Sequence, residues 1–458
     1  MEALTQANAP AKTARRSTVY VYMVSLVAAT SGLLFGFDIA VINGALLFLK
    51  QQFGLTEAQT EIAASSLLAG CVAGASVAGW LSDRYGRRLM LILSAVLFGL
   101  SAIGAALPNR LDEFAAARFA GGLAIGVASL LAPLYIAEVA PARIRGRLVS
   151  LNQMAIVSGI LLAYLVNWGL STQGQDSWRW MFAAAVLPSA FFLVALFFVP
   201  ESPRWLVKMN RRGEAMAVLR RVNSVSDADA ELRRIEETIA EESGTLGQLL
   251  EPGMRRALVI AVVLAVLQQV TGINTVLFYG ALIFKERVAG QTETAAIGAN
   301  VVVGLINFLS TIIALWVIDK AGRKPLLIIS AAILGSCEIA LGLAFLQPAP
   351  PAVLILTIMG VCGASFAVGL GPGVWVVLSE IFPTRIRGRA MSIATVSLWV
   401  ACVVLTFTFL TLARTITISG AFWVYAAMCA VTVVFVWRVT PETKGRTLEE
   451  IERLWKSG

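Results

Sequence analysis

Three charged side chains lie deep inside long apolar stretches of the chain: Asp38, Arg118 and Glu338. A charge inside hydrocarbon is costly, so such residues mark function by default. The chain has no histidine, and any proton carrier must therefore be a carboxylate. Pairing with Arg118 would keep Asp38 charged until a proton competes. We therefore predict that Asp38 is the proton acceptor and Arg118 the partner that tunes it; a structural ion pair that never titrates is the alternative.

The third buried charge, Glu338 in the stretch LLIISAAILGSCEIALG, has no obvious basic residue at its depth. Without a cation, a carboxyl group in hydrocarbon stays protonated or extends toward the nearer membrane surface. This interpretation is favoured over a direct role of Glu338 in transport.

Polar residues in the stretch LQQVTGINTVLFYG suit a polyhydroxylated solute: Gln268, Gln269, Asn274 and Tyr279. Asn274 and Tyr279 follow Gln268 at intervals close to whole helical turns. Gly272 lies between them and allows the helix to unwind locally. Side-chain amides both donate and accept hydrogen bonds, as sugar hydroxyls do. We predict a sugar-binding site here; hydrogen bonding between membrane helices is the alternative.

Three further residues extend this predicted site. Gln153 opens the apolar run that begins LNQMAIVSG, and Trp375 and Trp399 lie in two later runs. An indole ring offers a flat apolar surface for the C–H face of a sugar, together with one N–H donor. We therefore include all three among the predicted substrate-binding residues.

Two charged motifs lie at the ends of apolar stretches, and each occurs twice. DRYGRR begins at Asp83 and returns as DKAGRK, while EVAPARIRGR begins at Glu138 and returns as EIFPTRIRGR. Alternating acids and bases can form salt bridges between helices, which would hold the outward-open state and break when the inside opens. Anchoring by positive charge is the alternative, but it explains only the bases. The predicted gating residues are Asp83, Arg84, Arg87, Arg88, Glu138, Arg145, Asp319, Arg323, Glu380 and Arg387.

A third pair of motifs, PESPRW at Pro200 and PETKGR at Pro441, is a looser match. The offsets between the copies of the three motifs are 236, 242 and 241 residues. Nearly one offset for three pairs indicates that one half of the protein was duplicated. Two membrane halves around a pseudo-symmetry axis are how many secondary transporters build a site with alternating access.

The elements that must position these residues are apolar runs of about 20 residues, long enough to cross a bilayer. Twelve such runs cover approximately residues 18–48, 58–82, 88–107, 114–137, 148–169, 178–199, 255–284, 294–318, 325–346, 352–379, 390–413 and 418–438. We predict an all-α membrane protein with twelve transmembrane helices in two six-helix bundles. The predicted parts are a tail over 1–17, a bundle over 18–199, a linker with short helices over 200–254, a bundle over 255–438 and a tail over 439–458.

Composition and charge agree with this class. The 458 residues are 58% hydrophobic and 14% charged, whereas average soluble chains carry about 25% charged residues. With the N-terminus assigned to the cytoplasm, 30 of the 37 lysines and arginines fall on the cytoplasmic side. This asymmetry favours an inner (plasma) membrane protein with both termini cytoplasmic, and it explains the net charge of +9 without a nucleic-acid surface. No cysteine or other spacing suggests a metal or a disulfide.

Taken together, these motifs resemble the sugar porter family of the major facilitator superfamily, of the bacterial sugar/proton symporter type. The resemblance covers about residues 20–450 and rests on GWLSDRYGRR, APLYIAEVAPARIRGRLVSLNQ, PESPRWL, QQVTGIN, GPGVWVVLSEIFPTRIRGRA and PETKGRTLEEIE, in family order. It implies a twelve-helix fold of two six-helix bundles. An Asp at the position of Asp38 resembles the proton-coupled members, and the pairing of Asp38 with Arg118 is the one that the family implies.

The resemblance also maps sugar contacts onto the predicted binding residues, with two departures. Ile160 stands where xylose/proton symporters have a glutamine, and Leu398 stands where many monosaccharide carriers have a glutamine or asparagine. Some inositol/proton symporters have Leu-Trp at the second position, as here. The departures leave the substrate open between an aldohexose and a cyclitol and weaken the case for xylose.

The sequence thus predicts a transporter and not an enzyme: a symporter that imports a monosaccharide, most favourably an aldohexose such as glucose or galactose, with protons as the coupling ion and no cofactor. It is expected to work as a monomer in the lipid bilayer. An inositol, polyol or pentose symporter and a facilitative uniporter are the alternatives. A sugar sensor without flux and an exporter of apolar compounds are more distant rivals.

Overall fold

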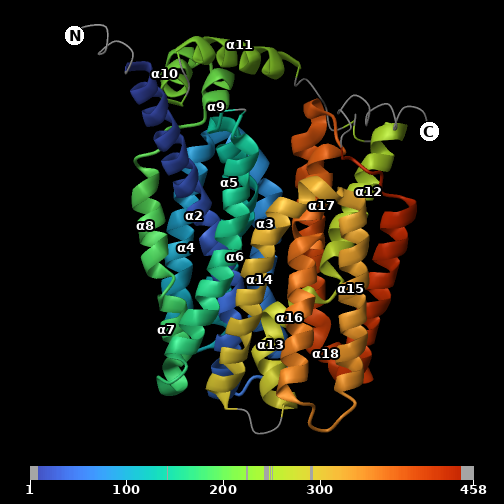
Figure 1. Cartoon of the computed structure of the whole chain (residues 1–458). Helices are drawn as coiled ribbons and strands as arrows, with labels where there is room; N and C mark the ends of the chain where they lie inside the picture. Colours follow the sequence, from blue (N-terminus) through green and yellow to red (C-terminus); the bar gives the residue numbers. More distant parts are fainter. Residues whose placement is uncertain are drawn as a thin grey trace.

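The structure is a computed structural model that describes residues 9–141, 143–222, 225–241, 251–288 and 292–444, together with positions 247 and 249. The described chain is helical throughout, and its helices run side by side in two groups (Figure 1). The ends of the described chain and the three short helices α9–α11 lie together at one end of the molecule. We call this end the linker face and the other end the opposite face.

The N-terminal half consists of six apolar spans. Its helices are α2 (Ala9–Gln52), α3 (Glu57–Tyr85), α4 (Arg87–Ala106), α5 (Leu111–Val139), α6 (Arg145–Leu170), α7 (Ser177–Ala183) and α8 (Val186–Leu196), with a short 3-10 turn, η1 (Gly174–Asp176), before α7. Glycines bring α3 and α5 close together: a Cβ on Gly122 would lie 1.9 Å from the main-chain oxygen of Leu67. The spacing of Gly122 and Gly126 thus serves close helix packing, as expected for small residues four apart.

Three short helices connect the halves: α9 (Pro203–Lys208), α10 (Arg212–Val222) and α11 (Val225–Glu241). They have a small core of their own, in which Trp205, Leu206, Leu219 and Leu232 are buried together. Because α11 exposes charged residues on its other side, it has the amphipathic character that its sequence predicts.

The C-terminal half contains α12 (Pro252–Gln269), α13 (Ile273–Arg287), α14 (Glu293–Ala321), α15 (Arg323–Ala344), α16 (Ala352–Val368), α17 (Leu370–Glu380) and α18 (Thr384–Arg438). Two spans are interrupted, between α12 and α13 and between α16 and α17. Conversely, α18 is two helices joined at a kink, where Thr417 has φ 72° and ψ 159°.

Within the described residues, 11 helical segments are long and apolar enough to cross a membrane. One of them, Ile386–Arg438, contains the kink at Thr417 and is long enough for two crossings. The total is therefore twelve spans, six in each half, and the predicted fold class is confirmed.

The polar contacts that join the two halves lie toward the opposite face. Lys50 of α2 pairs with Glu286 of α13 at 2.8 Å. Both carboxylate oxygens of Glu61, a residue of α3 that is only 1% exposed, accept hydrogen bonds of 2.8 Å from the main-chain N–H and the hydroxyl of Thr411 in α18. The halves are therefore closed against each other at this end of the molecule.

Asn43 of α2 makes the most extensive of these contacts. Its Nδ2 donates to the main-chain oxygens of Val276 and Leu277 at 3.2 and 2.8 Å, and its Oδ1 accepts from the N–H of Ala281 at 3.1 Å. Tyr164 of α6 also donates to the oxygen of Leu277. The Asn43 side chain thus bonds backbone oxygens and a backbone N–H group that lie about one helical turn apart on α13.

We predict that Glu61→Ala shifts the molecule toward opening at the opposite face. Loss of a buried acceptor pair costs the closed arrangement about 1–3 kcal/mol, which is a shift of about five-fold to a hundred-fold in the ratio of closed to open molecules. Spin labels on the exposed positions Ala58 and Thr415 would report the distance between α3 and α18, measured by double electron–electron resonance.

The matched control is Glu57→Ala, four residues earlier on α3. Glu57 pairs with Arg414 at 3.7 Å, and both side chains are largely exposed, so the loss should cost about 0–1 kcal/mol. Equal distance distributions for Glu61→Ala and Glu57→Ala would show that Glu61 does not hold the two halves together.

Candidate functional site

Asp38 and Arg118 meet inside the N-terminal half, as predicted. Arg118 on α5 is 0% exposed and Asp38 on α2 is 3% exposed. The shortest contact is from Nη2 of Arg118 to the main-chain oxygen of Asp38, at 2.7 Å. The carboxylate itself is farther away, with Nη1 of Arg118 and Oδ1 of Asp38 separated by 3.6 Å. Arg118 is thus held mainly by the backbone of α2 and only loosely by the carboxylate.

The remaining surroundings of Arg118 are apolar. Its guanidinium carbon lies 5.1 Å from the centre of the Phe182 ring, a distance at which the ring face attracts a cation. Its Nε and Nη1 atoms have no hydrogen-bond partner. A buried guanidinium with unused donors attracts a negative charge strongly, and Asp38 is the carboxylate that pairs with it.

The predicted sugar-binding amides surround the break between α12 and α13. Gly272 at the break has φ +87°, a left-handed conformation that glycine adopts without strain. Nε2 of Gln269 donates to Oε1 of Gln268 at 3.1 Å, and Nδ2 of Asn274 donates to Oε1 of Gln269 at 2.6 Å. The break therefore allows residues from two helical segments to form one chain of amides.

This chain of amides also reaches the second helix break. Nε2 of Gln268 donates to the main-chain oxygens of Leu370 and Gly371 at 2.8 and 3.1 Å, where α17 begins. The N–H of Leu370 in turn donates to the hydroxyl of Ser330 on α15. The two interrupted spans of the C-terminal half are thus linked through one glutamine side chain.

The aromatic residues of the predicted site separate into two groups. Trp375 on α17 is half-buried. The ring centre of Trp399 on α18 lies 5.7 Å from that of Phe35 in the other half. Among the described residues, the Nε1 atom of Trp399 has no hydrogen-bond partner. Tyr279 instead donates to the main-chain oxygen of Thr406 at 2.6 Å and is fully buried. Gln153, on α6, is half-buried. Tyr279 therefore contributes to packing against α18 and does not join the amide chain.

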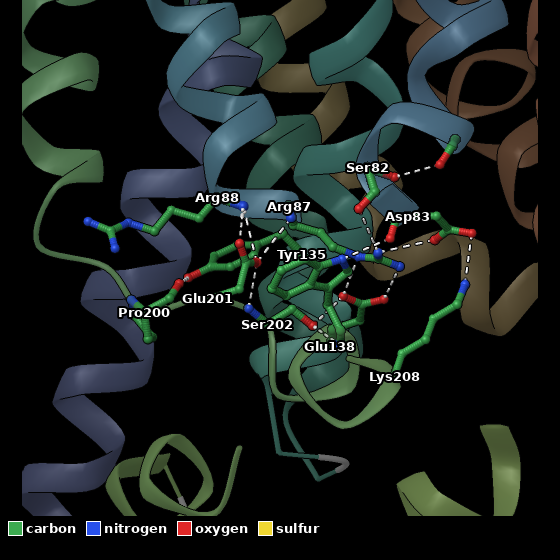
Figure 2. Close-up of polar contacts among 12 residues, drawn as sticks. Ser82, Asp83, Arg87, Arg88, Tyr135, Glu138, Pro200, Glu201, Ser202 and Lys208 are labelled. Carbon is green, nitrogen blue, oxygen red and sulfur yellow. Dashed lines mark hydrogen bonds and ion pairs between the residues drawn. The ribbon is translucent and has the colours of Figure 1, made fainter. Parts of the chain in front are cut away.

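At the linker face of the N-terminal half, the charged motifs form one cluster (Figure 2). Arg87 donates two hydrogen bonds of 3.0 Å to the carboxylate of Glu138, and its Nη1 also contacts Asp83 at 3.2 Å. Glu201 accepts hydrogen bonds from the main-chain N–H groups of Arg87 and Arg88, which begin α4. Three segments that are far apart in the sequence are joined by these contacts.

Gly86, immediately before α4, is required for this arrangement. It has φ +95°, and a Cβ at this position would lie 2.3 Å from Oε2 of Glu201. Burial raises the pKa of Glu201. The N–H donors and Arg87 act to lower this pKa, but burial has the larger effect. Ser202 adds a hydrogen bond from its hydroxyl to Glu138.

The C-terminal half repeats this cluster. Arg323 pairs with Glu380 at 3.0 Å, and Glu442 accepts from the N–H groups of Arg323 and Lys324 at the start of α15. Thr443 donates to Glu380, as Ser202 does to Glu138. For the more exposed Glu442, burial acts to raise the pKa, but the N–H donors outweigh it and lower the pKa. The repeated PES and PET segments therefore supply the acids that cap the starts of α4 and α15.

Several predicted gating residues have partners other than those expected. Arg145 contacts Glu231 of α11 at 3.4 Å, and Arg387 donates to the main-chain oxygen of Phe382. Arg88 caps the end of α8 through the main-chain oxygens of Leu196 and Phe197, and Arg84 lies against Trp80 and Tyr85. The side chain of Asp319 lies outside the described residues.

The ion pairs described at the linker face lie within one half or join a half to the linker. Arg87–Glu138 and Arg323–Glu380 are intact while the halves are joined at the opposite face. In the structure these ion pairs join α4 to α5 and α15 to α17, within each half. The expectation that they break when the linker face opens stays a prediction.

Three residues of this arrangement were missed by the sequence analysis: Asn43, Glu61 and Glu201. Glu61 lies only one turn inside its apolar run, where an acid is usually solvated at the membrane surface. Asn43 lies in the same apolar run as Asp38. The signal that could have identified it was a polar side chain within the apolar segment AVINGALLFL. For Glu201, the signal was its repetition as Glu442.

We predict that Glu138→Gln destabilises the protein strongly. Arg87 and Glu138 are 7% and 5% exposed at their side chains. Removing one charge of a buried pair costs up to about 3–5 kcal/mol, and the cost is smaller here because Asp83 still contacts Arg87. Thermal unfolding in detergent measures the effect. Asp176→Asn is the control, since its pair with Arg179 is solvent-exposed on the aspartate side; a similar melting temperature for both variants would contradict the prediction.

The chain matches the family described as "Sugar (and other) transporter" over residues 24–455. It is 39% identical to the arabinose-proton symporter of Bacillus subtilis (strain 168) over 450 residues, covering 97% of each chain. It is 38% identical to the D-xylose-proton symporter of Escherichia coli (strain K12) over 475 residues, covering 95% of this chain and 96% of the relative.

Solved structures agree with these relatives. The partially occluded inward open conformation of the xylose transporter XylE from E. coli superposes with a TM-score of 0.84 at 36% identity, covering 94% of this chain and all of the solved one. Both the sequence and the arrangement of its helices are therefore those of a known class of membrane transporter. The chain belongs to the sugar porter family of the major facilitator superfamily.

Proposed function

We propose that this protein is a symporter that imports a monosaccharide together with a proton. The observation that carries this proposal is the loose pair of Asp38 and Arg118. An acid that is buried beside a guanidinium, yet 3.6 Å from it, is placed to exchange its cationic partner for a proton. The symporters of arabinose and xylose among its relatives support the same coupling ion.

The geometry explains how the exchange avoids a large penalty. When Asp38 takes up a proton, Arg118 keeps its 2.7 Å hydrogen bond to the main-chain oxygen of Asp38 and its contact with Phe182. The cation is therefore not left without partners inside the membrane, which would be costly. Protonation loosens only the link to the carboxylate, so the Asp38 side chain can move while α2 and α5 stay joined through the backbone oxygen.

The amide chain is the proposed sugar site. Gln268, Gln269 and Asn274 bond to one another. Hydroxyl groups of a sugar both donate and accept, so they can replace these bonds at little cost. The unused N–H of Trp399 adds a donor, and the half-buried Trp375 offers an apolar face.

We further propose that the linker face is cytoplasmic and that the structure is inward-facing. The excess of lysine and arginine in the short loops at this face supports the orientation. Because the polar contacts between the halves lie at the opposite face, the external side is the closed one. Both halves of the proposed site belong to one chain, which supports function as a monomer.

Pentoses now have more support as the substrate than the expected aldohexose, because the two relatives named above transport arabinose and xylose. Ile160 and Leu398 favour a different outcome, since apolar side chains there leave fewer polar contacts for the sugar. We propose a pentose first, with an aldohexose and a cyclitol as the competing substrates.

A panel of radiolabelled sugars in proteoliposomes tests the substrate. We expect arabinose or xylose to be taken up and stimulated by an imposed pH gradient, with weaker uptake of glucose, galactose and inositol. If inositol alone is accumulated, the pentose assignment is wrong. Competition by apolar compounds but not by sugars would instead identify an exporter of apolar compounds.

Coupling through Asp38 is tested with Asp38→Asn. An amide cannot take up the proton, so we expect accumulation to fall from about fifty-fold at ~100 mV to equilibration, while exchange of sugar across the membrane continues. Asp112→Asn is the control, because Asp112 is exposed and pairs with Arg110 at the surface. Undiminished accumulation by Asp38→Asn would indicate a different coupling residue, whereas a wild type that only equilibrates the sugar would indicate a uniporter.

A further inference from the structure

Glu338 of α15 is 0% exposed and lies at the break between α12 and α13. A Cβ on Gly272 would lie 2.8 Å from Oε1 of Glu338 and 2.7 Å from the ring of Tyr425. The carboxyl group therefore packs directly against the glycine whose left-handed conformation makes the break. The sugar-binding amides Gln269 and Asn274 lie on either side of this break.

The surroundings of Glu338 contain neutral groups. The titratable groups that face it are Cys337 on its own helix, Cys362 on α16, and Tyr425 and Cys429 on α18. Within the part of the chain that the structure describes, its carboxyl group accepts a single weak hydrogen bond, from Sγ of Cys362 to Oε1 at 3.9 Å. Among the described residues, no lysine or arginine forms an ion pair with Glu338.

The other oxygen of Glu338, Oε2, is buried with no hydrogen-bond partner. An ionised carboxylate in such a place would have neither a cation nor adequate donors to replace water, which is very costly. A protonated carboxyl group avoids most of this cost. Asp38 differs because a guanidinium lies beside its carboxylate and bonds its main-chain oxygen.

We propose that Glu338 is a positioning residue that stays protonated through the transport cycle and supports the α12–α13 break from behind. Its neutral carboxyl group fills the space against Gly272 and Tyr425, and thereby holds Gln269 and Asn274 at the spacing that the sugar requires. Cys429 supports the same break through a weak hydrogen bond from its Sγ to the main-chain oxygen of Thr271. Glu338 does not carry the transported proton.

This role predicts different results for two substitutions. Glu338→Gln retains the shape and the neutrality of the protonated acid, so we expect KM within about two-fold of the wild type, an unchanged Vmax and an unchanged ratio of protons to sugar. Glu338→Ala leaves a cavity behind the break. We expect its KM to rise at least five-fold, with the ratio of protons to sugar unchanged.

Ser336→Ala is the matched control, because this exposed serine lies on the same helix and its hydroxyl bonds only within the helix, to the main-chain oxygen of Ala332. Loss of sugar-driven proton uptake in Glu338→Gln would overturn the proposal, since Glu338 would then carry the proton. An unchanged KM in a folded Glu338→Ala protein would overturn it as well.

The positioning role rests on the proposed sugar site, but the protonated state can be tested without a sugar. Infrared difference spectra of wild type and Glu338→Gln should show a protonated-carboxyl band in the wild type at neutral pH. A carboxylate band in its place would overturn the proposal even if Glu338→Ala fails to fold. If the band is present but no sugar is transported, the proposed function fails and the protonation state of Glu338 stands.

Discussion

The interior of a membrane offers no water to a charge or to a backbone polar group, and this protein's arrangement follows from how it meets that constraint. Arg118 is the most demanding case, because it is a fully buried guanidinium. The structure supplies the backbone oxygen of Asp38, the Phe182 ring and a carboxylate at longer range. These partners fix α5 against α2, and they leave the carboxylate as the one partner that can be exchanged.

The same constraint shapes the C-terminal half differently. Interrupted helices expose backbone groups that need partners inside the protein. Ser330 accepts from the N–H of Leu370 at the start of α17, Gln268 donates to two main-chain oxygens of the same turn, and the amide chain continues through Gln269 to Asn274. A chain of neutral amides binds hydroxyl groups well and protons poorly. The proposed mechanism thus separates two tasks, with proton exchange in the N-terminal half and sugar binding mainly in the C-terminal half.

The two halves share the capping and ion-pair arrangement at the linker face, but they do not share the charged residues inside the membrane. In both halves an acid caps the helix after the charged loop, a positive-φ glycine makes room for it, and an arginine holds a second acid. Asp38, Arg118 and Glu338 have no such repetition. These ion pairs join the helices within each half. In the proposed mechanism, the residues that differ between the halves provide coupling and recognition.

The sequence by itself determined the twelve spans, the two halves and the pairing of Asp38 with Arg118, because apolar length and isolated charges in hydrocarbon have few physical solutions. It could not determine that Arg87 and not Arg145 holds Glu138, or that Tyr279 packs against α18 away from the amides. Several partners lie within reach of each of these side chains, and only the angles at which helices pack select one. Glu61 and Asn43 make the same point, since their partners lie in the other half, 350 and 233 residues away. Contacts between the halves depend on how two separately folded bundles face each other, which no local pattern records.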